Sequence, residues 1–469
     1  MVNFVLSGLI RDIRLRVNLV RSMRILIISG VLFASITLAF FAPQRLTSLL
    51  LLFLVGLCII LILLRWPPIG IIGILVGGLF LPFSGPGGFN AAILGVAFML
   101  GLWLLEMVVM RHKIQFAPSS TTIPLIVFTV SALLSFGTGQ LHWYLFANQA
   151  PLDAQLGGLS IWILSAGAFI LVGNQIKKLR WLETFTWVFL IVGGIFILSR
   201  LIPSIGRTVI PLFLNGINPG SAFWIFMMVI PLSQILFNQE MGPKWKIILS
   251  GLFIATLYVA MVQASGWKSG YIPPLAGIAI ILGFRFKRFI WLLIPLGIVL
   301  SIYMLKQAIS SDQYSYITRL EAWRIVLEIS KVNPITGLGF ANYYWYTPLF
   351  PILGWSVVFN SHSQYVDIIA QTGLLGLACF GWLFWSVGKL GWALKDRAPA
   401  GFARAYVVGA LGGLVGTLVA GGFADWILPF VYNIGMNGFR VSVLAWIFLG
   451  GLVSIEQIVK NQSALQNSG

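Results

Sequence analysis

The stretch FNSHSQYVDIIAQTGLLG, residues 359–376, places a histidine where a polar segment meets a long apolar run. This residue, His362, is one of only 3 histidines in the chain. An imidazole with an ordinary pKa of about 6.5 can accept a proton at neutral pH, so His362 is a candidate general base. A local role is the alternative, in which His362 caps or solvates the helix expected from residue 364 onward.

Three cations and a carboxylate are the other candidates for chemistry. Lys268 lies in ASGWKSGY, between two apolar runs, and Arg319 and Arg324 belong to ITRLEAWRIVLEISKV. Asp425 lies in GGFADW, and a carboxylate so close to a membrane span is costly enough to indicate a purpose.

Each of these groups also has a local interpretation. Lys268 would snorkel to the membrane interface. Arg319 would face solvent or lipid headgroups, and Arg324 would pair with Glu328 four residues later. Asp425 would stand exposed in its loop.

Composition places these residues in a membrane protein. The chain is 59% hydrophobic and 9% charged, whereas soluble domains carry about 25% charge. A helix needs about 20 apolar residues to cross a bilayer, and about fourteen such runs are present. We therefore predict an all-α, polytopic membrane bundle of about 12 to 14 transmembrane helices, with residues 1–469 forming a single domain. The runs are 25–42, 47–65, 67–84, 90–110, 121–137, 158–174, 182–200, 221–238, 246–264, 271–285, 288–305, 364–388, 403–422 and 438–457.

Basic residues predict the orientation of these spans, because cytoplasmic loops are enriched in Lys and Arg. Five arginines precede the first run and place the N-terminus in the cytoplasm, and with an even number of spans the C-terminus lies there too. All the candidate residues above then fall on the external side. The net charge of +18 is a topology signal and an attraction to anionic membrane lipids, and does not indicate nucleic-acid binding.

One large external loop, residues 306–362, interrupts the pattern of short connections. Its ITRLEAWRIVLEISKV segment carries Ile317, Leu320 and Leu327 near helical spacing, which predicts an amphipathic helix at the membrane surface. The following Gly337 and Gly339 predict a tight turn before an aromatic cluster. A loop of this length usually carries function.

Several kinds of site have no signature in the sequence. There is no HExxH, no CxxC and no acidic pair at ligand spacing, so we expect no metal and no cofactor. Cys58 and Cys379 lie in different spans and indicate nothing about redox compartment. A histidine with nearby cations suits a polyanionic substrate such as a lipid-linked sugar diphosphate, whose departing charge Lys or Arg would stabilise.

At these residues the chain resembles the O-antigen ligase and polymerase superfamily. The matching segments lie within residues 217–377 and are INPGSAFWIFMMVIPL (217–232), SGWKSGY (265–271), RLEAW (319–323), NPITGLGFANYY (333–344) and NSHSQYVDIIAQTGLLGL (360–377). Two positions depart from the family pattern. Gly220 stands where Asn is often found, and Lys268 occupies the position of an arginine, which exchanges a planar bidentate fork for a point charge.

The resemblance implies a role for each candidate residue. His362 would be the catalytic base that activates the acceptor hydroxyl, and Lys268 and Arg319 would hold the diphosphate. Asp425, Arg324 and Asn360 would support them.

The resemblance also implies a fold similar to the C-type glycosyltransferases and a metal-independent, inverting transfer. The donor would be a glycan on undecaprenyl diphosphate, and the acceptor a lipid or glycan hydroxyl, at the periplasmic face of a bacterial inner membrane. Two alternatives stay open. One is a polymerase of the same superfamily that extends the lipid-linked glycan. The other is a transporter of small solutes, which the scarcity of ionisable residues along the spans disfavours.

Overall fold

The computed structural model divides the chain into two compact units, residues 1–65 and residues 66–469. It describes residues 29–30, 44–81, 83–216, 219–286, 288, 295, 306 and 313–467. The first unit contains helix α2 (Gln44–Arg65). All other described helices belong to the second unit, called unit 2 below.

The described residues form helices and no strand; two isolated bridges, one of them Ser84 to Asn90, are the only β-type pairings among them. Every predicted apolar run in this part of the chain is largely helical, and 25–42 and 288–305 lie outside it apart from single positions. Eight described helices are long and apolar enough to cross a membrane, which confirms the all-α class. The main helices of unit 2 are α3 (Pro67–Phe80), α4 (Ala91–Leu105), α5 (Thr122–Thr138), α6 (Leu152–Gln175), α7 (Leu179–Leu201), α8 (Pro203–Leu212), α9 (Ser221–Phe237), α10 (Pro243–Tyr258), α11 (Ile272–Arg285), α13 (Gln313–Ser330), α14 (Asn342–Tyr346), α15 (Gln364–Arg397), α16 (Phe402–Gly421) and α17 (Phe439–Asn467).

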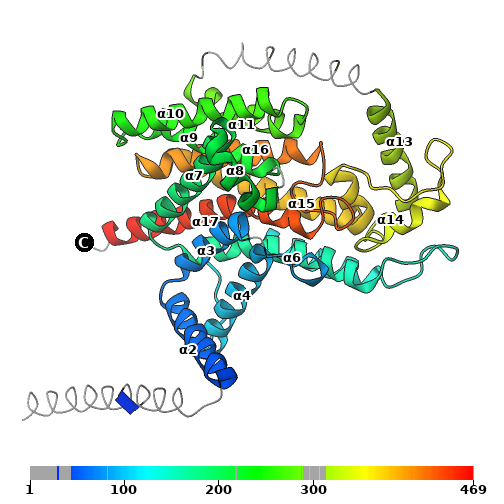
Figure 1. The fold of residues 1–469 in the computed structure, drawn as a ribbon, viewed down its shortest axis with the longest axis horizontal. Coiled ribbons are helices and arrows are strands. Elements are labelled where there is room, and N and C mark those ends of the chain that lie inside the picture. The colour runs from blue at the N-terminus through cyan, green and yellow to red at the C-terminus, as the bar shows by residue number, and fades with distance from the viewer. Residues whose placement is uncertain are drawn as a thin grey trace, which may run out of the picture. The chain divides into compact units, whose positions relative to one another are not determined.

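The most buried helices of unit 2 are α9, α16 and α17, and α11 packs against α9 and α16 (Figure 1). Nearly all of α9 is buried, as expected for a helix that is apolar on every side. α11 and α16 cross with backbones in contact, because a Cβ at Gly277 would lie 2.6 Å from the carbonyl oxygen of Gly412. Small residues permit this kind of close helix crossing in membrane proteins.

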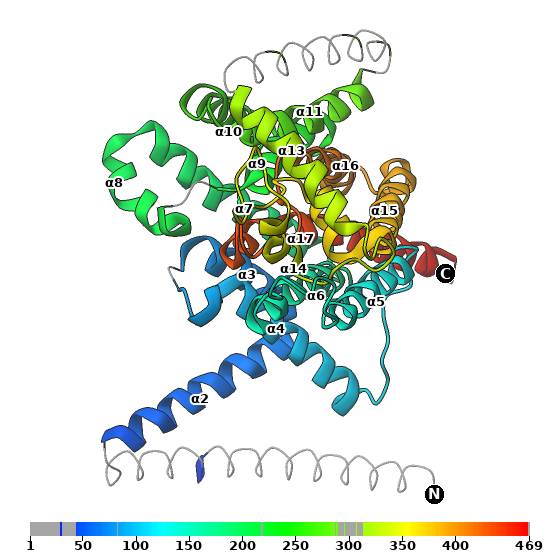
Figure 2. The same cartoon turned by 90° about the vertical axis from the view of Figure 1, so that its right-hand side faces the viewer.

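The predicted helix in the long loop is confirmed as α13 (Gln313–Ser330), and one face of it packs on the protein. Ala322, Ile325, Val326 and Ile329 pack against α14 and α15 in one apolar cluster. The residues that carried the prediction, Ile317, Leu320 and Leu327, lie on the other face and are exposed. α13 therefore has two apolar stripes, and only one is covered by the protein. Figure 1 shows α13 and α14 at one end of unit 2, here called the α13 end, and Figure 2 looks onto it.

The turn after α13 is inserted into a break in α15. Gly373 has a φ of 67° and interrupts that helix. The backbone groups freed there pair with residues 334–339: the N–H of Leu338 donates to the carbonyl of Ala370 at 2.9 Å, and the N–H of Leu374 donates to that of Pro334 at 2.8 Å. The tight turn predicted at Gly337 and Gly339 is confirmed, with φ values of 72° and 81°.

Replacing Gly339 with alanine is expected to destabilise the protein by about 2 to 4 kcal/mol, because a positive φ is strained in alanine and the site has no room. The backbone of Gly139 touches Gly339, since a Cβ at Gly139 would lie 2.7 Å from the Gly339 Cα. Thermal unfolding of the purified protein measures the change. Gly381→Ala is the control, because it lies in helix α15 with no atom within 4 Å; it should be neutral or stabilising. Equal unfolding temperatures for the two variants would contradict this account.

Candidate functional site

His362 lies in the short turn that leads into α15, with its side chain half-buried. Its φ of 49° is unusual for a residue other than glycine. The turn is held locally by Asn360, whose side-chain oxygen accepts the His362 N–H at 3.1 Å. Ser363, not His362, is the residue that precedes the helix as its N-cap. The capping alternative for His362 is therefore wrong.

Three helices fix the residue before His362. Trp323 of α13 donates its indole N–H to the carbonyl of Ser361 at 2.7 Å. The Ser361 hydroxyl donates to Oδ1 of Asp367 in α15 at 2.7 Å. Tyr343 of α14 donates to the same oxygen at 2.5 Å. The buried carboxyl of Asp367 therefore connects α14, α15 and the histidine turn.

Burial, followed by the charge of Asp367, raises the pKa of Tyr343, so its phenol stays protonated and donates. Tyr343→Phe removes this donor and is expected to cost about 1 to 3 kcal/mol of stability, the usual penalty for a buried acceptor that loses a partner. Thermal unfolding measures the loss. Tyr314→Phe is the matched control, because the Tyr314 side chain is exposed. A Tyr343→Phe protein as stable as the control would show that the network does not support the turn.

The turn around His362 forms one wall of the candidate site, and the connection between α16 and α17 forms a second wall. Asp425 is fully buried there, and it accepts the N–H of Phe430 at 2.5 Å and the side-chain amide of Asn433. Gln364, at the start of α15, accepts the N–H of Leu428 at 2.7 Å. The exposed alternative for Asp425 is therefore wrong. Its burial raises the pKa of Asp425 to about 6.

Arg319 stands between these two walls. Its guanidinium donates to the carbonyl of Phe423, two residues before Asp425, at 3.4 Å. Burial of His362, followed by the positive charge of Arg319, lowers the pKa of the histidine. His362 is consequently neutral at pH 7, in the form that can accept a proton.

Lys268 begins the short 3₁₀ turn Lys268–Gly270, just before α11. This turn is fixed to α9, since the Ser221 hydroxyl donates to the carbonyl of Ser269 at 2.7 Å. The neighbouring Trp267 packs edge to face on Trp426, with ring centres 5.5 Å apart. Because Trp426 follows Asp425, the segment before Lys268 packs directly on the wall that contains Asp425.

Arg324 lies apart from these groups. It forms an ion pair with Glu321 at 2.6 Å, and its side chain is 69% exposed. The expected pairing with Glu328 is wrong, since Glu328 forms an ion pair with Lys331. Arg324 lies five positions after Arg319 on the helix, a rotation of about 140°, so the two arginines point in different directions.

The site as a whole combines a neutral histidine, a nearby guanidinium and a buried carboxyl at the α13 end, with a lysine on an adjoining turn. Such donors suit an anionic ligand. Within the described residues no group of three or more His, Cys, Asp or Glu is placed to hold a metal ion. A search with the sequence finds no matching family model and no matching curated protein.

Proposed function

We propose that this protein is a membrane glycosyltransferase of the O-antigen ligase type. It transfers a glycan from undecaprenyl diphosphate to an acceptor hydroxyl, without a metal and with inversion at the anomeric carbon. Its fold would be similar to that of the C-type glycosyltransferases. It would lie in a bacterial inner membrane with both termini in the cytoplasm and the α13 end at the periplasmic face.

One observation carries the proposal: His362 is half-buried, and this burial, followed by the positive charge of Arg319, lowers the pKa of the histidine and favours its neutral form. A neutral imidazole next to a permanent cation suits a reaction that removes a proton from one reactant and stabilises negative charge on the other. The exposed stripe of Ile317, Leu320 and Leu327 on α13 favours a position for this helix at the lipid surface. There a lipid-linked donor would be within reach.

In the proposed mechanism the acceptor hydroxyl gives its proton to His362 as its oxygen attacks the anomeric carbon. The new bond forms on the face opposite the diphosphate, and the bond from the anomeric carbon to the diphosphate oxygen breaks. The diphosphate leaves with the electron pair, and Arg319 and Lys268 stabilise its charge. His362 then releases its proton to water.

The test is glycan transfer by the purified protein in nanodiscs, with undecaprenyl-diphosphate glycan, a set of lipid and glycan acceptors, and chelator throughout. A single added glycan per acceptor supports the ligase. A ladder of extended lipid-linked products would assign the polymerase reaction instead. Absence of product with every acceptor, while radiolabelled small solutes cross proteoliposomes, would overturn the proposal in favour of transport.

A further inference from the structure

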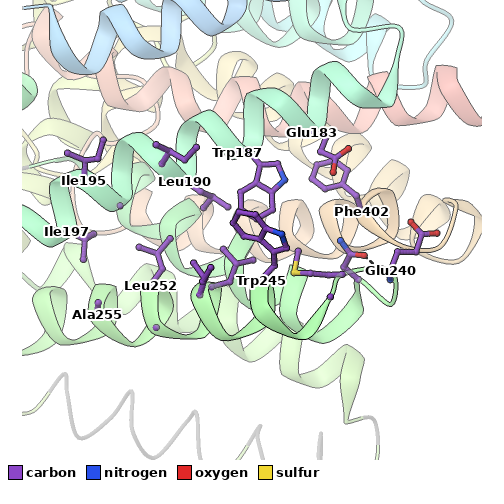
Figure 3. Close-up of a pocket in the computed structure, with 18 of the residues that line it drawn as sticks. Glu183, Trp187, Leu190, Ile195, Ile197, Glu240, Trp245, Leu252, Ala255 and Phe402 are labelled. Atoms are coloured by element: carbon purple, nitrogen blue, oxygen red, sulfur yellow. Dashed lines mark hydrogen bonds between the residues drawn. The ribbon is translucent and has the colours of Figure 1, made fainter.

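A long apolar groove lies between α7 and α10 (Figure 3). Its volume is about 1030 Å³, which is large for a small-molecule site. Phe402, the first residue of α16, also lines it. Because α16 runs for 20 residues before reaching the wall that contains Asp425, the Phe402 end of the groove lies about 30 Å from Asp425. It is therefore a separate feature of unit 2.

The polar and apolar residues of the groove are sorted along its length. Figure 3 shows Glu183 and Glu240 at one end, here called the mouth, and aliphatic residues such as Ile195 and Leu252 at the other. Trp187 of α7 and Trp245 of α10 lie between the mouth and the aliphatic residues, with ring centres 5.1 Å apart. Tryptophan takes this position at the boundary between lipid headgroups and hydrocarbon.

Two acidic residues line the mouth, and two lysines are sequence neighbours of residues that line the groove. In the part of the chain that the structure describes, neither Glu183 nor Glu240 has a side-chain hydrogen bond or an ion pair. Glu240 is packed over Gly401, which has a φ of 85° and leaves no space for a side chain. Lys178 and Lys244 are exposed and directly precede lining residues. A ligand with both a cation and an anion in its polar head complements this arrangement.

The length of the groove fits a lipid chain. From Trp187 to Leu198, both of which line it, α7 rises by about 16 Å. This is about half of a hydrocarbon core of roughly 30 Å, the depth of one leaflet.

We propose that the groove binds a zwitterionic phospholipid whose head group ends in a primary ammonium. Glu183 and Glu240 accept hydrogen bonds from the ammonium, and Lys178 and Lys244 flank the phosphate. An acyl chain lies among the aliphatic residues beyond the two tryptophans. This assignment is independent of the proposed function, because none of these residues belongs to the site around His362.

The test is native mass spectrometry of the full-length protein with three phospholipids that share the same acyl chains. Their head groups are ethanolamine, its trimethylated analogue choline, and glycerol. The ethanolamine lipid should be retained about tenfold over the other two, the ratio that one charge-assisted hydrogen bond provides. In the double variant Glu183→Gln/Glu240→Gln this preference should disappear. A preference for the anionic glycerol lipid, or one that survives in the double variant, would overturn the proposal.

A second pair of variants tests the acyl-chain site. Gly251 lines the groove in α10 and has no atom within 4 Å of an added Cβ, so Gly251→Phe fills the groove without a clash at the Cβ. Gly101→Phe is the matched control, because Gly101 in α4 is equally unobstructed but lies outside the groove. Gly251→Phe should lose at least fivefold in retention of the ethanolamine lipid, and the control should not. Equal retention by both variants, or a protein dimer that only Gly251→Phe disrupts, would assign the groove another role.

Discussion

Replacing His362 with alanine is expected to lower the rate of glycan transfer about 10²- to 10⁴-fold, the usual contribution of a positioned general base. The donor should still bind, because Arg319 and Lys268 remain. The loss should therefore appear in kcat and leave KM for the lipid-linked glycan nearly unchanged. Initial rates over a range of donor concentrations separate the two parameters.

His142→Ala is the matched control for this variant, because His142 lies exposed in the loop between α5 and α6. It should retain wild-type kcat within about twofold. If His362→Ala transfers glycan as fast as His142→Ala, the assignment of His362 as base is wrong.

The pH profile of the wild type provides an independent check on this base. Burial, with the charge of Arg319, lowers the pKa of His362 below its ordinary value. The base is active when neutral, so kcat should be constant above that pKa and fall as the pH decreases through it. The fall should lie below about pH 6.5, the pKa of a free histidine. A profile that already declines between pH 8 and 7 would contradict a neutral His362.

Much of the helical framework could be predicted from the sequence, because continuous apolar runs form helices wherever the structure describes them. The sequence does not predict features that depend on contact with a second segment, distant in the chain. On α13, spacing alone did not distinguish the stripe that packs on α15 from the exposed stripe of Ile317 and Leu320. The break at Gly373 was missed because the carbonyls that accept its freed N–H groups come from residues 334–335.

The same limit applies to the candidate site, where residue types can be read from the sequence but long-range contacts cannot. Residue types made His362, Arg319 and Asp425 candidates, but the side chains and backbone groups that contact them or their segments come from distant parts of the sequence. Asp367 binds Tyr343 across 24 positions, and Gln364 holds a backbone N–H 64 positions away. The one sequence signal for such a role was a polar residue at the start of an apolar run, as at Gln364 and Asp367. The partner of Arg324 was missed because spacings of three and four residues are equally good on a helix.

Arg319→Gln is expected to reduce kcat about 10²-fold, the cost of removing one donor from a charge that develops in the transition state. It should also change the pH dependence. The positive charge of Arg319 lowers the pKa of His362, so its removal raises that pKa. The decline in kcat at acidic pH should therefore begin at a higher pH than in the wild type.

Arg324→Gln separates this effect from a general loss of positive charge on α13. Arg324 is exposed and paired with Glu321, so its replacement should change kcat by less than about twofold, in line with the small energies of surface ion pairs. The acidic limb of the profile should also stay in place. If Arg319 had only a structural role, Arg319→Gln would lower the amount of folded protein without shifting the acidic limb, because the charge of Arg319 would not act on His362. If Arg319→Gln lowers kcat but leaves the acidic decline at the same pH as in the wild type, the charge of Arg319 does not act on His362. That result would contradict the proposed mechanism, in which the two residues act together.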